Sequence, residues 1–158
     1  MDYRVTSFIT MVTVFVTYVA FIWLKYGIQK SISASYYALP ENLRILFTLF
    51  CWGFAFPAII GGVDVTPLMF FAGAGICFVG AAPQILEKNV YKIHMIAAIS
   101  GMVFSQLAIF FGYHMLWLNI TSVVLCAIIP FIFKKTYFWW MELVVFAAAC
   151  IAEGIDIL

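Results

Sequence analysis

A run of 41 residues between Lys92 and Lys134 contains no Asp, Glu, Lys or Arg. A helix crosses a bilayer core with about 20 apolar residues, so this run predicts two spans joined by a tight turn near residues 112–115. A helix at the surface of a soluble protein would place polar side chains along one face, and this run has no such face. The pattern therefore predicts a membrane protein.

Charged residues and prolines divide the whole chain into six apolar segments of similar length. They predict an all-α fold, a six-helix membrane-spanning bundle with short loops, in one integral membrane domain of residues 1–158. The expected spans are approximately residues 5–24, 43–61, 67–84, 93–112, 116–133 and 138–157. The last span carries Glu142 and Glu153, so an interfacial helix is the alternative there, although its apolar stretch 143–152 favours a span.

The composition agrees with this pattern, since 66% of the residues are hydrophobic and only 9% are charged. Soluble domains carry roughly 25% charged residues. Basic residues form no cluster of the kind that binds nucleic acid, so no nucleic-acid partner is expected. The four cysteines all lie in apolar runs without CxxC spacing, which is typical of small buried residues.

Positive charges are distributed unevenly between the two ends of the six expected spans. All but one of the eight basic residues fall on one side of the membrane, and Arg4 alone falls on the other. The positive-inside rule assigns the richer side to the cytoplasm, so we expect both termini outside a plasma (cytoplasmic) membrane. The residues on the cytoplasmic side are Lys25, Lys30, Arg44, Lys88, Lys92, Lys134 and Lys135.

Signatures of catalysis or metal binding are missing from the sequence, including HExxH, GxSxG, GxGxxG, the P-loop and CxxC. His94 and His114 are 20 residues apart, about 30 Å along a helix, and cannot share a metal within one subunit. We therefore expect no metal, no cofactor and no enzymatic activity. An intramembrane enzyme that modifies lipid is the least favoured alternative, because its usual paired carboxylates or histidine cluster are not evident.

The last expected span carries the most informative polar residues of the chain. Glu142 and Glu153 are 11 residues apart, about three helical turns, and so share one face with Phe146 and Ala149. An ionised carboxylate cannot face lipid cheaply, which predicts that this face meets protein or water and handles cations or protons. The alternative is two interfacial acids, with Glu142 paired to a lysine at 134 or 135.

Neutral polar residues lie within the fourth and fifth expected spans, and three of them are the main candidates for a site. Gln106 and Ser105 fall near the middle of the fourth span, and Asn119 falls in the outer part of the fifth. A buried amide must find hydrogen-bond partners. These residues are candidates for the lining of a substrate path, and the alternative is that they only bond neighbouring helices to one another.

Small residues spaced four apart predict two helix-packing ridges. Ala97 and Gly101 continue to Ser105 on the fourth span, and a second ridge on the third span consists of Gly73, Cys77 and Ala81. Such ridges allow two helix backbones to approach closely, which matters in lipid because hydrophobicity does not drive helices together there. The ridges fit packing within the bundle, and they fit a contact between subunits equally well.

Residues 30–42 form the one substantial polar loop that the sequence predicts. Three serines and two tyrosines precede Pro40, which interrupts any helix. The simplest interpretation is an interfacial loop whose tyrosines lie among lipid headgroups. The alternatives are a re-entrant or gating segment, which must be buried in protein or face water, and a contact with a cytoplasmic partner.

Polar and acidic groups inside otherwise apolar spans favour a channel or transporter for a small ion or solute, acting as a homo-oligomer in contact with membrane lipid. The alternative is a non-transporting membrane subunit or scaffold that binds lipid or a partner membrane protein. The small extramembrane mass and the scarcity of deep charges favour that alternative.

Overall fold

The computed structural model describes residues 2–82 and 90–158, and within these ranges every regular element is helical. The all-α prediction is therefore confirmed. Short helical turns are α2 (Ser35–Ala38), the 3-10 turn η1 (Glu41–Leu43) and the π-helical turn η3 (Ala108–Gly112). The long helices are α1 (Tyr3–Tyr26), α3 (Ile45–Gly62), α4 (Leu68–Ala81), α5 (Val90–Leu107), α6 (Leu116–Ile132) and α7 (Tyr137–Ile157).

The ends of α1 show how local sequence sets a helix boundary. Asp2 caps the N-terminus, because its carboxylate accepts a 3.0 Å hydrogen bond from the backbone N–H of Arg4. Gly27 ends the helix with a φ of 75°, a conformation that glycine adopts without strain, while its N–H bonds to the Trp23 carbonyl. The 24 residues between these caps extend about 36 Å, which exceeds the thickness of a bilayer's hydrocarbon core.

Within residues 2–82 and 90–158, four helical segments are long and apolar enough to cross a membrane: Tyr3–Tyr26, Glu41–Gly62, Lys92–Gly112 and Tyr137–Ile157. Two further apolar helices are shorter, with 14 residues in α4 and 17 in α6. Each of the six ranges expected from the sequence overlaps with one of these helices, although residues 83 and 84 of the third range lie outside the described residues. The apolar helices indicate a multi-pass protein embedded in a membrane.

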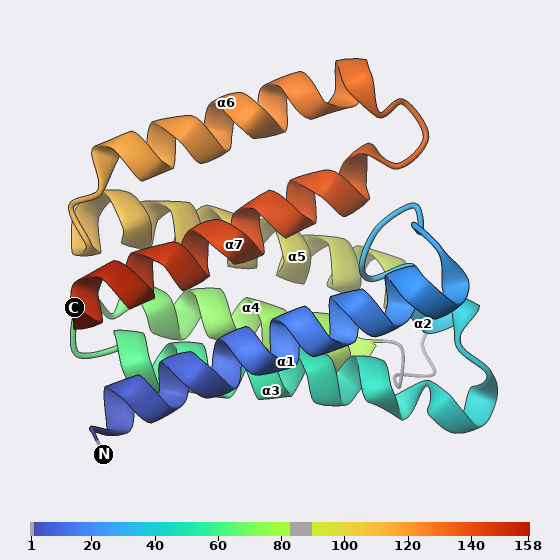
Figure 1. The fold of residues 1–158 in the computed structure, drawn as a ribbon, viewed down its shortest axis with the longest axis horizontal. Coiled ribbons are helices and arrows are strands. Elements are labelled where there is room, and N and C mark those ends of the chain that lie inside the picture. Colours follow the sequence, from blue (N-terminus) through green and yellow to red (C-terminus); the bar gives the residue numbers. More distant parts are fainter. Residues whose placement is uncertain (1, 83–89) are drawn as a thin grey trace.

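The helices α1, α3, α4 and α5 pack side by side in chain order, and α7 then returns against α1, α3 and α5 (Figure 1). The helix α6 packs mainly against α7, on the far side from α1. The N- and C-termini lie at the same end of the bundle (Figure 1). The last helix is therefore surrounded by four others, and is not an appendage at the edge of the bundle.

The backbones of α4 and α5 approach each other closely at two glycines, Gly75 and Gly101. A Cβ atom added to Gly75 would lie 2.8 Å from the carbonyl oxygen of Ala97 and 2.8 Å from the Cα of Gly101. A Cβ added to Gly101 would meet the Ala72 carbonyl oxygen at 3.3 Å. Ala97 and Gly101 of the expected α5 ridge thus face the backbone of α4, and only residues without bulk allow this approach.

The expected ridge on α4 faces a different neighbour, α3. Gly73 lies against Ala55, whose carbonyl oxygen would be 3.1 Å from an added Cβ, and the carbonyl of Cys77 accepts a 3.1 Å hydrogen bond from the indole of Trp52. The third member, Ala81, is the last residue of α4. Successive glycines therefore let α4 fit between α3 on one side and α5 on the other.

Charged residues separate to the two ends of the bundle. Lys25 ends α1, and Lys134 and Lys135 lie in the connection from α6 to α7, which is at the same end (Figure 1). At the opposite end Arg4 pairs with Asp156. The arrangement in space thus keeps the asymmetry seen in the sequence, although Lys88 lies outside the described residues.

The contact between α4 and α5 predicts that Gly75→Ala destabilises the protein by about 1–3 kcal/mol, because its methyl group would meet backbone atoms that cannot turn away. Gly53→Ala is the matched control, since its Cβ would meet only the side chain of Val14, at 3.3 Å. Reversible unfolding in mixed micelles measures both. Equal stabilities of the two variants would contradict the assigned helix contact.

Candidate functional site

The polar loop expected at residues 30–42 is folded back into the protein against the first half of α7. The side chains of Ile32, Ser35 and Leu39 are buried. The carbonyl oxygen of Lys30 accepts a 3.2 Å hydrogen bond from the backbone N–H of Trp139, at the start of α7. These contacts fold residues 30–42 back against the helix bundle, and we call residues 30–42 the re-entrant segment in this sense.

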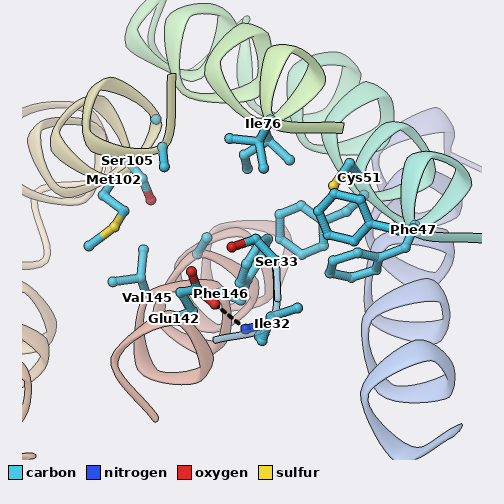
Figure 2. A pocket seen from close by; sticks show the side chains of 16 residues that line it. Ile32, Ser33, Phe47, Cys51, Ile76, Met102, Ser105, Glu142, Val145 and Phe146 are labelled. Carbon is cyan, nitrogen blue, oxygen red and sulfur yellow. Dashed lines mark hydrogen bonds between the residues drawn. The ribbon is translucent and has the colours of Figure 1, made fainter. Parts of the chain in front are cut away.

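Glu142 connects this segment to α7. Its carboxylate accepts a hydrogen bond from the backbone N–H of Ile32 (Figure 2). The backbone N–H of Ser33 also interacts with the carboxylate. Beside this contact the hydroxyls of Tyr18 and Ser35 are 2.6 Å apart, which ties the segment to α1 as well. Within residues 2–82 and 90–158 Glu142 forms no ion pair, so the expected alternative of a pair with Lys134 or Lys135 is not seen.

A small cavity of about 70 Å³ lies beside Glu142, between the re-entrant segment and helices α3, α4, α5 and α7. A space of this size has room for a few particles as large as water. Its walls are mostly apolar, and the polar groups on them come from Glu142, Ser33 and Ser105 (Figure 2). The hydroxyl of Ser105 is buried and has no hydrogen-bond partner among the described residues.

An aromatic cluster lies beyond this cavity, towards the second half of α7. The ring of Phe146 stacks on Phe15 of α1 with centroids 5.5 Å apart and meets Phe54 of α3 edge-on at 4.7 Å. Phe146 and Ala149 also line the cavity, so they lie on the same side of α7 as Glu142. The rings of Phe15, Phe54 and Phe146 therefore pack against one another at a level of α7 between Glu142 and Glu153.

Glu153 lies beyond the aromatic cluster and is completely buried, with 0% of its surface exposed. Neither carboxylate oxygen has a hydrogen-bond partner among the described residues. It packs against Gly61 of α3, where a Cβ atom would overlap with the carboxylate, and Ser7 of α1 lies beside the same glycine. The missing side chain at position 61 therefore leaves the space that the Glu153 carboxylate occupies in this arrangement.

An ion pair lies next to Glu153 at this end of the bundle. Arg4 pairs with Asp156, and its Nε donates a 3.2 Å hydrogen bond to the carbonyl oxygen of Gly61. The hydroxyl of Tyr113 lies beside Gly62, is buried, and has no hydrogen-bond partner among the residues that the structure describes. The carboxylate of Glu153 and the hydroxyl of Tyr113 have no hydrogen-bond partner among the described residues. Both lie close to the Arg4–Asp156 ion pair, which joins the two ends of the chain.

Gln106 and Asn119 form a separate polar cluster between α5 and α6. The Asn119 amide donates 3.0 Å hydrogen bonds to the backbone carbonyl and to the side-chain Oε1 of Gln106, and the hydroxyl of Ser122 donates to the same Oε1 at 2.7 Å. They border an open groove of about 570 Å³. The structure therefore brings Ser105 together with Glu142, and places Gln106 and Asn119 elsewhere, as a link between two helices.

Sequence reasoning did not identify several groups at these sites. The backbone N–H groups of Ile32 and Ser33 leave no trace in a side-chain pattern. Arg4 was noted only as the lone cation of the outer side. The second expected span ends at Gly61, which is followed by Gly62. Two adjacent glycines leave space beside a helix, and in the structure the side chains of Glu153 and Tyr113 lie against them.

Loss of the Glu142 carboxylate is predicted to loosen the re-entrant segment. Glu142→Ala leaves the backbone N–H of the buried residue Ile32 without its acceptor, at a cost of about 1–3 kcal/mol, and also removes the interaction with the N–H of Ser33. Glu142→Gln keeps one acceptor oxygen and should loosen the segment less. Trypsin cleavage after Lys30 is the measurement, with Glu41→Ala as an exposed control. Equal cleavage rates in the Ala and Gln variants would contradict the contact.

Comparisons with protein-family models, with curated proteins and with solved structures found no significant match to this chain. The apolar helix α7 carries Glu142, which is half-buried and lines the cavity, and Glu153, which is fully buried, and Phe146 of the aromatic cluster lies between them along the helix.

Proposed function

We propose that the protein is a transporter for a small cation and that the inward face of α7 carries its path. One observation supports this most strongly: Glu153 is fully buried in an otherwise apolar bundle, and Glu142 is half-buried and lines the internal cavity, about 16 Å away along the same helix. Ionisable residues at membrane depth are costly and commonly mark ion or proton paths. The aromatic cluster around Phe146 separates the two acids, which favours alternating access over a permanently open pore.

The topology that we propose has six spans, with both termini outside a plasma (cytoplasmic) membrane. The common position of the two termini supports an even number of crossings (Figure 1). The lysines of the α6–α7 connection and of the end of α1 support the assignment of the opposite end to the cytoplasm. In this orientation Glu142 lies nearer the cytoplasm and Glu153 nearer the outside.

The unit that we propose is a homo-oligomer surrounded by lipid. The groove between α5 and α6 supports this, because α6 packs mainly against α7 and leaves the groove open on its other side. A second copy of the chain would cover apolar side chains there, such as those of Val103 and Phe111, and the polar cluster of Gln106 and Asn119.

A non-transporting scaffold is the second candidate, and one observation favours it. Glu142 already has a structural task, because it holds the backbone of the re-entrant segment in place. A carboxylate used only as such an anchor would need no transported ion. The two candidate functions predict different results when the charge of Glu142 is removed but its hydrogen-bonding shape is kept. A transporter should change its ion flux, and a scaffold has no ion flux to change.

Ion flux in proteoliposomes tests the proposal, with K⁺, Na⁺, H⁺ and Cl⁻ gradients applied in turn. Glu142→Gln is expected to lower cation flux about tenfold or more, since losing a charged partner costs about 1.5–3 kcal/mol. Glu41→Gln is the control, because Glu41 is exposed in η1 and pairs only with its neighbour Arg44.

Unchanged flux in folded Glu142→Gln protein would contradict a path along α7. Wild-type flux no greater than that of empty liposomes would favour the scaffold instead. In that case a search for a partner by mild-detergent purification would follow.

A further inference from the structure

Glu153 is the most unusual side chain of this structure. It is a carboxyl group with no exposed surface and no hydrogen-bond donor among the described residues. Glu142, by comparison, accepts a hydrogen bond from the backbone N–H of Ile32. An ionised carboxylate buried without donors is so costly that such a group holds a positive charge of some kind or becomes neutral.

The ionisable groups around Glu153 leave it without a counter-charge. Those that act on it electrostatically are Arg4 on α1, Asp156 and Cys150 on α7, and Tyr113 in the turn after η3. Arg4 is the one cation of this set, and it pairs with Asp156 and donates to the Gly61 carbonyl. With Glu153 ionised, the cluster would carry one unbalanced negative charge.

The surroundings of Glu153 suit a proton better than a metal ion. Among the residues that the structure describes, no group of three or more His, Cys, Asp or Glu side chains could hold a metal. The backbone of Gly61 abuts the carboxylate, and the carbonyl oxygen of that residue already accepts from Arg4. A proton needs neither a coordination shell nor space.

We propose that Glu153 binds an exchangeable proton, which makes the proton the ion that this protein moves or uses to drive another solute. This inference rests on the proposed transport function for its purpose, and on the contacts of Glu153 for its chemistry.

Release of the proton requires Arg4 to change partners. When the O–H bond of Glu153 breaks, the proton passes to water on the outer side and its electron pair stays on the carboxylate. The new negative charge then competes with Asp156 for the guanidinium of Arg4. Because Arg4 lies in the first turn of α1 and Glu153 lies near the end of α7, proton release changes the contact between the first and last helices.

Infrared spectroscopy of the purified protein in lipid nanodiscs at pH 7 tests the proposal directly. The wild type and the exposed control Glu41→Gln are expected to show the C=O stretching band of a neutral carboxylic acid, and Glu153→Gln is expected to lose it. A wild-type minus Glu153→Gln spectrum that contains only ionised-carboxylate bands would overturn the proposal.

A second variant leaves Glu153 in place. Asp156→Asn frees Arg4 to pair with Glu153, so the neutral-acid band should weaken at pH 7. An unchanged band in this variant would contradict the assignment to Glu153, even if Glu153→Gln fails to fold.

Proton uptake into proteoliposomes separates this inference from the proposed function. Observation of the neutral-acid band without proton flux would support the proton site at Glu153 and contradict the proposed transport function. Flux of another cation without the band would support transport and contradict the proton site.

Discussion

Ionised side chains cannot face the hydrocarbon of a membrane cheaply, and this constraint on α7 organises the whole bundle. The helix carries acids at positions 142 and 153, so it is stable only where other helices cover that face. The packing of α1, α3 and α5 against α7 supplies the cover. Gly61 leaves room for one acid, and the re-entrant segment supplies donors for the other.

The re-entrant segment depends on α7 in turn, because its backbone polar groups are also packed against apolar helices. Irregular backbone that is packed into an apolar helix bundle must find hydrogen-bond partners within the protein. Ile32 and Ser33 find theirs on Glu142, while Lys30 accepts from the first turn of α7. The acid and the segment thus satisfy one another, and a bond that stabilises the fold lies at the edge of the cavity that we assign to the ion path.

The helix positions could be predicted from the sequence because charges and prolines mark the ends of apolar runs, and the 11-residue spacing placed Glu142 and Glu153 on one face of α7. The rotation of each helix about its axis could not be predicted, because apolar side chains surround most of them. Ser105 therefore faces Glu142 while its neighbour Gln106 faces α6. Backbone donors such as Ile32 N–H carry no side-chain signal at all.

The central claim is a six-span bundle with α7 inside it. The most direct test asks from which face of the membrane a reagent reaches each connection between helices. Single cysteines replace Asp64 and Lys134 in a background without the four native cysteines, and an impermeant maleimide is applied to each face of oriented membranes. The account predicts that position 134 reacts from the cytoplasmic face and position 64 from the outside. Reaction of both positions from the same face would contradict the bundle as a spanning unit.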